Sequence, residues 1–328
     1  MTILADETTR ILVQGITGRE AATFVKDSLE YGAKVVAGVT PGKGGGAVHG
    51  VPVYDTVAAA LAEHPAEATV ISVPPGAVRD AALEALAAGL SLLVIVTERV
   101  PRRDVAEILG TAEACGATVV GPNSLGILSP GKTKVGMVGG PAADVRKAYT
   151  PGPVGILSRS GGMTTEIANL LTQHGIGQST CVSIGGDPLV GSTFRNLLPA
   201  FAADPETRAV VLFCEPGGTA EEDLAEAVRA RGLPLPVVAF VAGRFADEIP
   251  GVRFGHAAAI VEGERGSTRS KIAAFREAGI PVAEAFVDIV TILKPLLGAR
   301  AGRGGVASAR RRSGGSARGA ARLGRGSA

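Results

Sequence analysis

Short apolar segments of strand length alternate with segments of helical periodicity along most of this chain, and this alternation constrains the fold more than any other feature. An apolar run of about six residues between turn residues is typical of a strand buried on both faces. Strands that alternate with helices form βαβ units, whose right-handed crossovers build a doubly wound parallel sheet. In the first half of the chain the pattern predicts strands at 10–15, 34–39, 68–73, 91–96 and 117–122, and helices at 20–31, 77–88 and 102–115.

A second α/β series follows in the other half of the chain. Residues 123–152 interrupt the rhythm with proline and glycine, so we expect a connection between two domains there. The second series predicts strands at 153–158, 179–184, 208–213 and 236–241, and helices at 163–174, 192–203, 219–231, 267–278 and 286–297. The expected division is therefore a first domain at 1–128, a linker at 129–152, a second domain at 153–298 and a tail at 299–328.

Composition argues against several classes of protein. The three cysteines, Cys115, Cys181 and Cys214, are widely spaced and form no C-x-x-C pair, so neither a disulfide framework nor a zinc site is indicated. We therefore expect a reducing, cytoplasmic compartment. No apolar run reaches the ~18 residues of a membrane-spanning helix, and no group of His, Cys, Asp or Glu has the spacing of metal ligands.

The basic character of the chain belongs to its last thirty residues. Of 33 basic and 31 acidic residues, eight arginines lie in 299–328, which leaves 25 basic against 31 acidic residues in the rest of the chain. This glycine-, serine- and arginine-rich tail has too few apolar residues to form a core, so we expect it to be disordered. It lacks the interleaved aromatic residues of single-strand binding proteins, and a nucleic-acid partner is therefore not favoured.

A glycine turn between the first predicted strand and helix, "QGITGRE" at 14–20, is suited to binding an anion. Such a turn directs backbone N–H groups and a helix N-terminus at a phosphate, although the same residues also fit an ordinary tight turn. The second strand ends in "AGVTPGKGGG", which offers Lys43 and no acid for ribose hydroxyls. A cation there fits a phosphorylated ribose, as in NADP or coenzyme A.

Three segments in the second half of the chain carry candidate site residues. In "ILSRSGGMTTE", Ser160, Gly161 and Gly162 begin a predicted helix and can receive a phosphate or carboxylate. Glu215 follows a predicted strand and either orients an imidazole or stands near a helix N-terminus. "VRFGHAAAIV" places His256 between a glycine and small apolar residues, which fits a reactive histidine or a buried loop.

The motifs "QGITGRE", "GVTPGKGG", "GPN", "SRSGGMTTE", "GQSTCVSIGGDP" and "GHAAAI" occur in this order, and together they resemble the α-subunit of succinyl-CoA synthetase (succinate–CoA ligase). The resemblance spans residues 11–297. It implies an N-terminal CoA-binding Rossmann-like domain and a C-terminal flavodoxin-like ligase domain. Because the chain has neither a P-loop nor an ATP-grasp-like segment, it also implies a β-subunit that supplies Mg-ATP or Mg-GTP, in an αβ or α2β2 assembly.

The resemblance also implies residue roles. His256 matches the histidine that becomes phosphorylated, and Glu215 matches the acid that orients it. Ser160, Gly161 and Gly162 match the helix start that receives the phosphate, and Thr165 lies where the family commonly has a substrate-binding tyrosine. The matching CoA-binding residues are Thr17, Gly18, Arg19, Glu20, Lys43, Val96, Thr97 and Glu98.

The implied reaction joins a small carboxylic acid to CoA through a phosphohistidine and an acyl phosphate, as in the tricarboxylic acid cycle. Besides Thr165, the sequence departs from the family at Ser124 and Leu125, where "GPNCPG" is common, and within "GHAAAI", where "GHAGAI" is usual. The acid is therefore open between succinate and a related acid such as malate. Two other functions remain open: an NADP-dependent oxidoreductase and a non-catalytic sensor of CoA or acyl-CoA.

Overall fold

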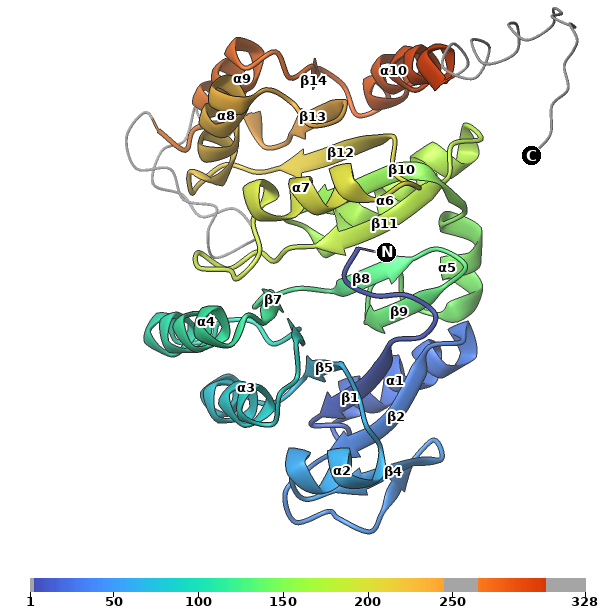
Figure 1. Cartoon of the computed structure of the whole chain (residues 1–328), viewed down its shortest axis with the longest axis vertical. Helices are drawn as coiled ribbons and strands as arrows, with labels where there is room; N and C mark the ends of the chain where they lie inside the picture. The colour runs from blue at the N-terminus through green and yellow to red at the C-terminus, as the bar shows by residue number, and fades with distance from the viewer. Residues whose placement is uncertain (1–2, 245–264, 305–328) are drawn as a thin grey trace, which may run out of the picture.

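The computed structural model describes residues 3–244 and 265–304, with side chains to residue 298. Two seven-stranded sheets, each flanked by helices, make up this part of the chain (Figure 1). The first sheet has the order β3-β4-β2-β1-β5-β6-β7, and the second has the order β14-β13-β12-β10-β11-β8-β9. Most neighbouring strands are parallel, so the predicted α/β fold with two mainly parallel sheets is confirmed.

The first sheet confirms the predicted strands and helices of the first half. The segments 34–39 and 102–115 agree with the structure at both ends, and the other elements differ by a few residues. The elements are β1 (Arg10–Gln14), α1 (Arg19–Tyr31), β2 (Lys34–Val39), β5 (Ala68–Ile71), η1 (Pro75–Ala77), α3 (Val78–Ala87), β6 (Leu92–Ile95), α4 (Arg102–Cys115) and β7 (Thr118–Val120).

Three short elements at one edge of this sheet were not predicted. They are β3 (Ala47–Val48), β4 (Val51–Tyr54) and α2 (Val57–Glu63). Pro52 argues against a strand, because proline donates no hydrogen bond to a sheet and is normally confined to edge strands. Strand β4 lies close to the edge of the sheet, where only the two-residue β3 follows it. Helix α2 has seven residues, which is too few for its periodicity to stand out, and it begins at the capping hydroxyl of Thr56.

The second sheet is built mostly from the predicted second series. Strand β10 lies between β11 and β12, and the chain then continues outward to β13 and β14. The elements are β10 (Pro151–Ser158), α6 (Gly161–Gln173), β11 (Gln178–Ser183), α7 (Phe194–Ala203), β12 (Ala209–Cys214), α8 (Ala220–Arg231), β13 (Val237–Val241), α9 (Thr268–Glu277), β14 (Val282–Ala283) and α10 (Asp288–Gly304).

The segment expected to be a linker, 129–152, has regular structure instead. Strands β8 (Gly126–Ser129) and β9 (Thr133–Gly136) form an antiparallel hairpin, and β8 pairs with β11 of the second sheet. Helix α5 (Ala142–Ala148) follows. The glycines that indicated a loop lie within the hairpin, since Gly126 is the partner of Gly136 in the register. These residues therefore connect the two halves of the chain through paired strands and a helix.

The two sheets are packed together through this hairpin. Figure 1 shows β9 beside α1 of the first domain, and the two elements are in contact. The Ser28 hydroxyl of α1 donates to the Gly136 carbonyl at 3.4 Å, and the Ser129 hydroxyl donates to the Ala5 carbonyl at 2.9 Å. Apolar side chains of both halves, including Phe24 and Leu157, belong to one buried cluster. The two domains are therefore held in a fixed relation by a shared core.

The first residues of the expected disordered tail belong to a helix. Helix α10 continues to Gly304, so residues 299–304 are helical rather than disordered. The rest of the tail, 305–328, lies outside the described residues. No helix within 3–244 and 265–304 is both long enough and apolar enough to cross a bilayer.

One buried lysine on β9 gives a test of this packing. Lys134 is fully buried, its ammonium donates to the Gly140 carbonyl, and burial lowers its pKa to about 8 from an ordinary 10.5. We expect Lys134→Met to raise the free energy of unfolding by about 2 kcal/mol at pH 7, because it removes the cost of burying a charge. Between pH 8 and 10.5 the Lys134 amine is protonated in the unfolded wild-type chain but not in the folded one. The free energy of unfolding of the wild type therefore rises with pH over this interval. The stability difference between Lys134→Met and the wild type becomes smaller as a result.

Urea unfolding of both proteins at pH 7 and at about pH 9.5 measures this difference. A stability difference that stays constant over this interval would show that the Lys134 ammonium is not destabilised by its burial.

Candidate active site

The strand order of each sheet places a ligand crevice at a definite position. In the first sheet the chain leaves β1 on one side to form β2 and returns on the other side to form β5. In the second sheet it leaves β10 to form β11 and returns to form β12. Open α/β sheets bind ligands at the carboxyl ends of strands at such switch points. This rule gives two candidate ligand positions, one beyond β1 and β5 and one beyond β10 and β12, and we refer to them as the first and the second candidate crevice.

The first crevice is lined by the glycine turn at 15–18. The Gly15 amide donates to the Val39 carbonyl at 2.7 Å, and the Gly18 amide donates to the Gly15 carbonyl at 2.9 Å. Gly18 is the N-cap of α1, and it has no side chain that could accept a hydrogen bond from the first N–H groups of that helix. Thr17, Gly18, Arg19 and Glu20 are all exposed, as residues that meet a ligand must be.

The Lys43 loop lies next to this turn. The Thr17 and Thr40 hydroxyls are 3.2 Å apart, and the Lys43 amide donates to the Thr40 carbonyl at 3.0 Å. The Lys43 side chain is exposed, and no described residue forms an ion pair with it. The structure thus brings Thr17 close to the loop that carries Lys43, and it leaves a cation there for an anionic ligand.

The segment after β6 reaches the same edge from the other side of the crevice. The Thr97 hydroxyl donates to the Val73 carbonyl at 2.7 Å, in the segment that follows β5. Val96 is half-buried, and the exposed Glu98 side chain lies 3.6 Å from the Arg99 guanidinium. The predicted CoA-binding residues therefore come from loops after β1, β2 and β6 that share one carboxyl edge.

The second crevice begins at the N-terminus of α6. Ser160 is the N-cap, and its hydroxyl accepts from the Met163 amide at 3.4 Å. Its backbone is held in turn by Ser158, whose hydroxyl donates to the Ser160 carbonyl at 2.6 Å. Gly161 and Gly162 form the first turn, where N–H groups lack partners in the helix. The predicted phosphate-binding residues thus lie together at a helix N-terminus beyond β10.

Arg159 is a residue of this crevice that the sequence analysis did not single out. Arg159 is only 5% exposed, it directly follows β10, and its backbone amide donates to the Phe213 carbonyl of β12 at 3.3 Å. One terminal nitrogen donates to the Asp187 carbonyl at 3.4 Å, and Nε has no hydrogen-bond partner among the described residues. An arginine between a buried strand and a glycine-opened helix could have been recognised as an anion-binding residue.

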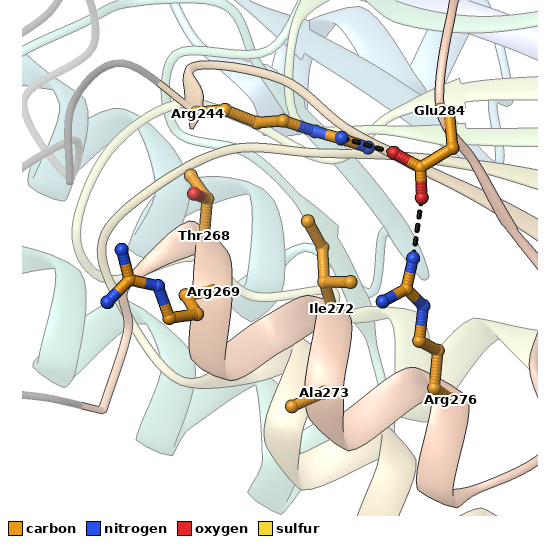
Figure 2. A pocket seen from close by; sticks show the side chains of 7 residues that line it. All are labelled: Arg244, Thr268, Arg269, Ile272, Ala273, Arg276 and Glu284. Carbon is orange, nitrogen blue, oxygen red and sulfur yellow. Dashed lines mark hydrogen bonds and ion pairs between the residues drawn. The ribbon is translucent and has the colours of Figure 1, made fainter.

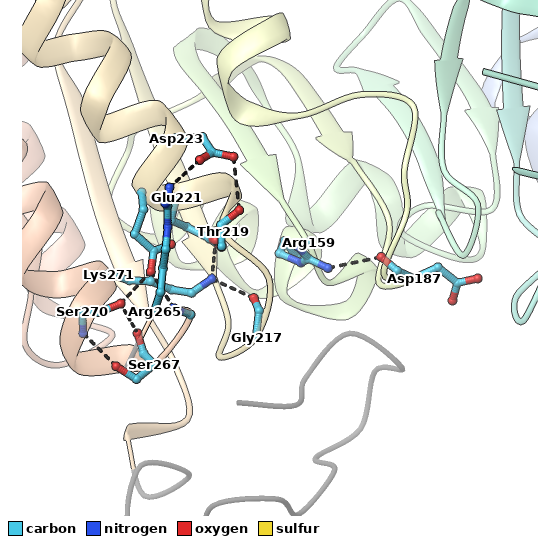
Figure 3. Close-up of polar contacts among 12 residues, drawn as sticks. Arg159, Asp187, Gly217, Thr219, Glu221, Asp223, Arg265, Ser267, Ser270 and Lys271 are labelled. Atoms are coloured by element: carbon cyan, nitrogen blue, oxygen red, sulfur yellow. Dashed lines mark hydrogen bonds and ion pairs between the residues drawn. The ribbon is translucent and has the colours of Figure 1, made fainter. Parts of the chain in front are cut away.

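Glu215 lies across this crevice, directly after β12. The loop that continues from it is firmly anchored, because the Gly217 amide donates to the Gly266 carbonyl at 2.8 Å and the Lys271 ammonium donates to the Gly217 carbonyl at 2.8 Å. Lys271 also pairs with Glu221, and both side chains are completely buried (Figure 3). Burial raises the pKa of the neighbouring Cys214 thiol well above its ordinary value, which disfavours the nucleophilic thiolate form.

The described residues do not test the roles of two predicted site residues. His256 falls in 245–264, outside the described residues, and its role stays a prediction. Thr165 lies in α6, but its hydroxyl is 2.9 Å from the Tyr149 hydroxyl at the end of α5. Burial raises the pKa of Tyr149, so that phenol stays protonated. The substrate role of Thr165 therefore also stays a prediction.

A separate cavity of about 380 Å³ lies beside α9 and the end of β14 (Figure 2). Glu284 pairs there with Arg244 and Arg276, and these guanidinium groups hold the pKa of the Glu284 carboxyl below its ordinary value. None of the predicted site residues within the described ranges lines this cavity. The same ranges contain no group of three or more His, Cys, Asp or Glu side chains that could hold a metal ion.

Comparison with known protein families supports the two-domain description. Residues 6–99 match the family model of the CoA binding domain, and residues 157–280 match that of CoA-ligase. The first match covers the loops after β1, β2 and β6, and the second covers the α6 N-terminus and the loop after β12. Each match therefore coincides with one of the two crevices.

Individual relatives extend over nearly the whole chain. Succinate–CoA ligase [ADP-forming] subunit alpha 1 of Archaeoglobus fulgidus is 48% identical over 90% of this chain and 98% of its own length. A subunit of the ADP-forming sulfoacetate–CoA ligase of Bilophila wadsworthia is 41% identical over 91% of this chain and 100% of its own length.

A solved structure gives the same result at the level of the fold. ATP citrate lyase from Methanothrix soehngenii, in complex with citrate and coenzyme A, superposes with a TM-score of 0.85 and 26% identity. The superposition covers 92% of this chain and 52% of that one. With two family models on the two sheets and relatives matching nine-tenths of the chain, the protein belongs to the succinate–CoA ligase α-subunit family and is an acid–CoA ligase subunit.

Proposed function

We propose that this α-subunit works with a nucleotide-binding β-subunit, in an αβ or α2β2 assembly, to join a small carboxylic acid to CoA through a phosphohistidine. The observation that carries the proposal is the set of groups that meet at the second candidate crevice. There the N-terminus of α6 and the buried Arg159 guanidinium stand opposite the loop of Glu215. Helix N-termini and guanidinium groups stabilise a phosphoryl group during transfer, and they do so without acting as acids or bases.

The first crevice is proposed to bind CoA through its phosphates. The uncapped N-terminus of α1 offers backbone N–H groups to an anion, and the exposed Lys43 ammonium supplies a positive charge beside it. Val96, Thr97 and Glu98 border the same edge from the other side. This arrangement supports a polyphosphorylated ligand that lies along the carboxyl edge of the first sheet.

The proposed reaction has three steps. A neutral His256 imidazole attacks the terminal phosphorus of the nucleoside triphosphate, and the bond to the nucleoside diphosphate breaks. A carboxylate oxygen of the substrate then takes the phosphoryl group, which frees the imidazole and forms an acyl phosphate. The CoA thiolate finally attacks the acyl carbon, and orthophosphate leaves. In this scheme Glu215 accepts a hydrogen bond from the imidazole and fixes its tautomer.

The substrate is proposed to be a short acid with a second anionic group, such as succinate or malate. The relatives described above are named for succinate and sulfoacetate, which both have a carboxylate and another acidic group. The Arg159 guanidinium and the α6 N-terminus would favour such an anion. Turnover of succinate, malate and sulfoacetate by the complete complex, measured as thioester formed, ranks these acids.

Intact mass tests the phosphohistidine. The chain is incubated with its co-expressed β-subunit, Mg²⁺ and ATP or GTP, and we expect one added phosphoryl group that is labile to acid. His256→Ala should remove it, whereas the matched change His64→Ala should leave it in place, because His64 is the C-cap of α2, which packs on β2 and β4 of the first sheet. A chain that binds CoA but is never phosphorylated would be a sensor, and one that binds NADP instead of CoA would be an oxidoreductase; either result contradicts the proposal.

A further inference from the structure

A loop of the second domain lies directly on the carboxyl edge of the first sheet. The Gly186 amide donates to the Asn123 carbonyl at 3.1 Å, and the Gly191 amide donates to the Gly121 carbonyl at 2.9 Å. Gly185 has a φ of +113°, and a Cβ atom there would lie 2.3 Å from the Pro122 carbonyl oxygen. The two backbones are therefore too close for any residue but glycine at this point.

Asp187 occupies the centre of this contact. Its side chain is almost fully buried, at 3% exposure, and each carboxylate oxygen accepts a hydrogen bond from a different loop of the first domain. Oδ2 accepts from the Arg99 amide at 3.1 Å, and Oδ1 accepts from the Asn123 side-chain amide at 3.1 Å. One carboxylate thus joins the loop after β6 to the loop after β7.

Both of these donors belong to residues in a strained conformation. Arg99 has a φ of +58° and Asn123 a φ of +56°, which few non-glycine residues adopt. Such conformations persist only where surrounding contacts hold them, and they cluster at functional sites. The Asp187 carboxylate supplies contacts of this kind to both residues.

The contacts of Asp187 continue in two directions. On one side, Arg99 directly follows Thr97 and Glu98, and the Asn123 amide donates to the Thr97 carbonyl at 2.9 Å. On the other side, the Asp187 carbonyl accepts from the buried Arg159 guanidinium (Figure 3), which precedes the α6 N-cap. A chain of hydrogen bonds therefore runs from the CoA-binding edge to the second crevice.

We propose that Asp187 is a positioning residue that holds the CoA-binding loop after β6 at a fixed distance from the phosphoryl-transfer crevice. The inference rests on the proposed function, because it takes the two crevices to be the CoA and phosphoryl sites. Thioester formation requires the CoA thiol to approach the acyl phosphate closely, and a displacement of about 1 Å costs roughly a hundredfold in rate. Phosphorylation of the histidine does not involve CoA, so Asp187 affects only the later step.

Asp187→Asn and Asp187→Ala in the complete αβ complex test this role. Asparagine keeps the shape and one acceptor oxygen, but its NH₂ group faces one of the two donors. We expect the KM for CoA to rise about tenfold in Asp187→Ala and less in Asp187→Asn, with histidine phosphorylation within about twofold of wild type. The Kd for CoA should weaken in the same order, and this measurement does not require turnover.

Asp204→Asn is the matched control. Asp204 is also buried, at 5% exposure, and it accepts from the Thr207 hydroxyl at 2.6 Å and the Glu206 amide at 3.2 Å, near the end of α7. It should lower thermal stability as Asp187→Asn does and leave the KM and Kd for CoA unchanged.

Three results would overturn the inference: a Kd for CoA in Asp187→Asn equal to that of wild type, an equal loss of CoA affinity in Asp204→Asn, or a loss of phosphorylation as large as the loss of thioester formation. Failure of the proposed function is recognised separately, because wild type itself would then show no phosphohistidine.

Discussion

Lys271→Met should lower the free energy of unfolding by about 3–5 kcal/mol, which is the usual cost of leaving a buried charge without its partner. Lys271 and Glu221 are both completely buried, and one oxygen of Glu221 already has no hydrogen-bond partner among the described residues. Removing the ammonium would leave the carboxylate uncompensated in a medium of low polarity. It would also remove the donor that holds the Gly217 carbonyl, two residues after Glu215.

Denaturant unfolding at neutral pH, followed by circular dichroism, measures this change. Arg229→Met is the matched control, because Arg229 pairs with Glu277 on the surface and its loss should cost less than about 1 kcal/mol. The double variant Lys271→Met/Glu221→Leu should recover most of the lost stability, since no buried charge then remains. A single Lys271→Met variant that loses less than about 1 kcal/mol would show that the buried pair does not stabilise this loop.

Gly15→Ala should remove CoA binding, with a loss of affinity of about a hundredfold or more. A Cβ atom at Gly15 would lie 2.1 Å from the Ser72 carbonyl oxygen, and the φ of +81° is itself unfavourable for alanine. The clash is with backbone, so the turn at 15–18 must move away from the segment after β5. That movement would displace the α1 N-terminus, which is the part of the crevice proposed to bind the CoA phosphates.

Calorimetric titration with CoA, together with a thermal unfolding curve, separates the local effect from unfolding. Gly89→Ala is the matched control, because Gly89 has a φ of +86° and nothing lies within 4 Å of its Cβ position. It should cost about 1 kcal/mol of stability, owing to the φ angle alone, and leave CoA affinity unchanged. A Gly15→Ala protein that is folded and binds CoA within twofold of wild type would place the CoA phosphates elsewhere.

The sequence was sufficient for the elements that are long, apolar and regular. Residues 34–39 and 102–115 were predicted with both ends correct, because an apolar strand and an amphipathic helix carry their burial in their own residue order. The strands β8 and β9 were missed, because their residue order does not show that they are paired. In β8 and β9, glycine lies within the strands of a hairpin, and only the partner strands show that this backbone is paired.

By itself, the sequence determined the class of fold, the glycine turns at the carboxyl ends of strands and the family resemblance, since these are encoded in contiguous residues. Only the tertiary structure showed that Arg159 contacts Asp187, 28 residues away, and that Lys271 contacts Glu221, 50 residues away. In the sequence each of these residues is an ordinary charge, which is usually solvated at the surface. Burial changes this, because a charge withdrawn from water needs a specific partner, and the strand order brings that partner into reach.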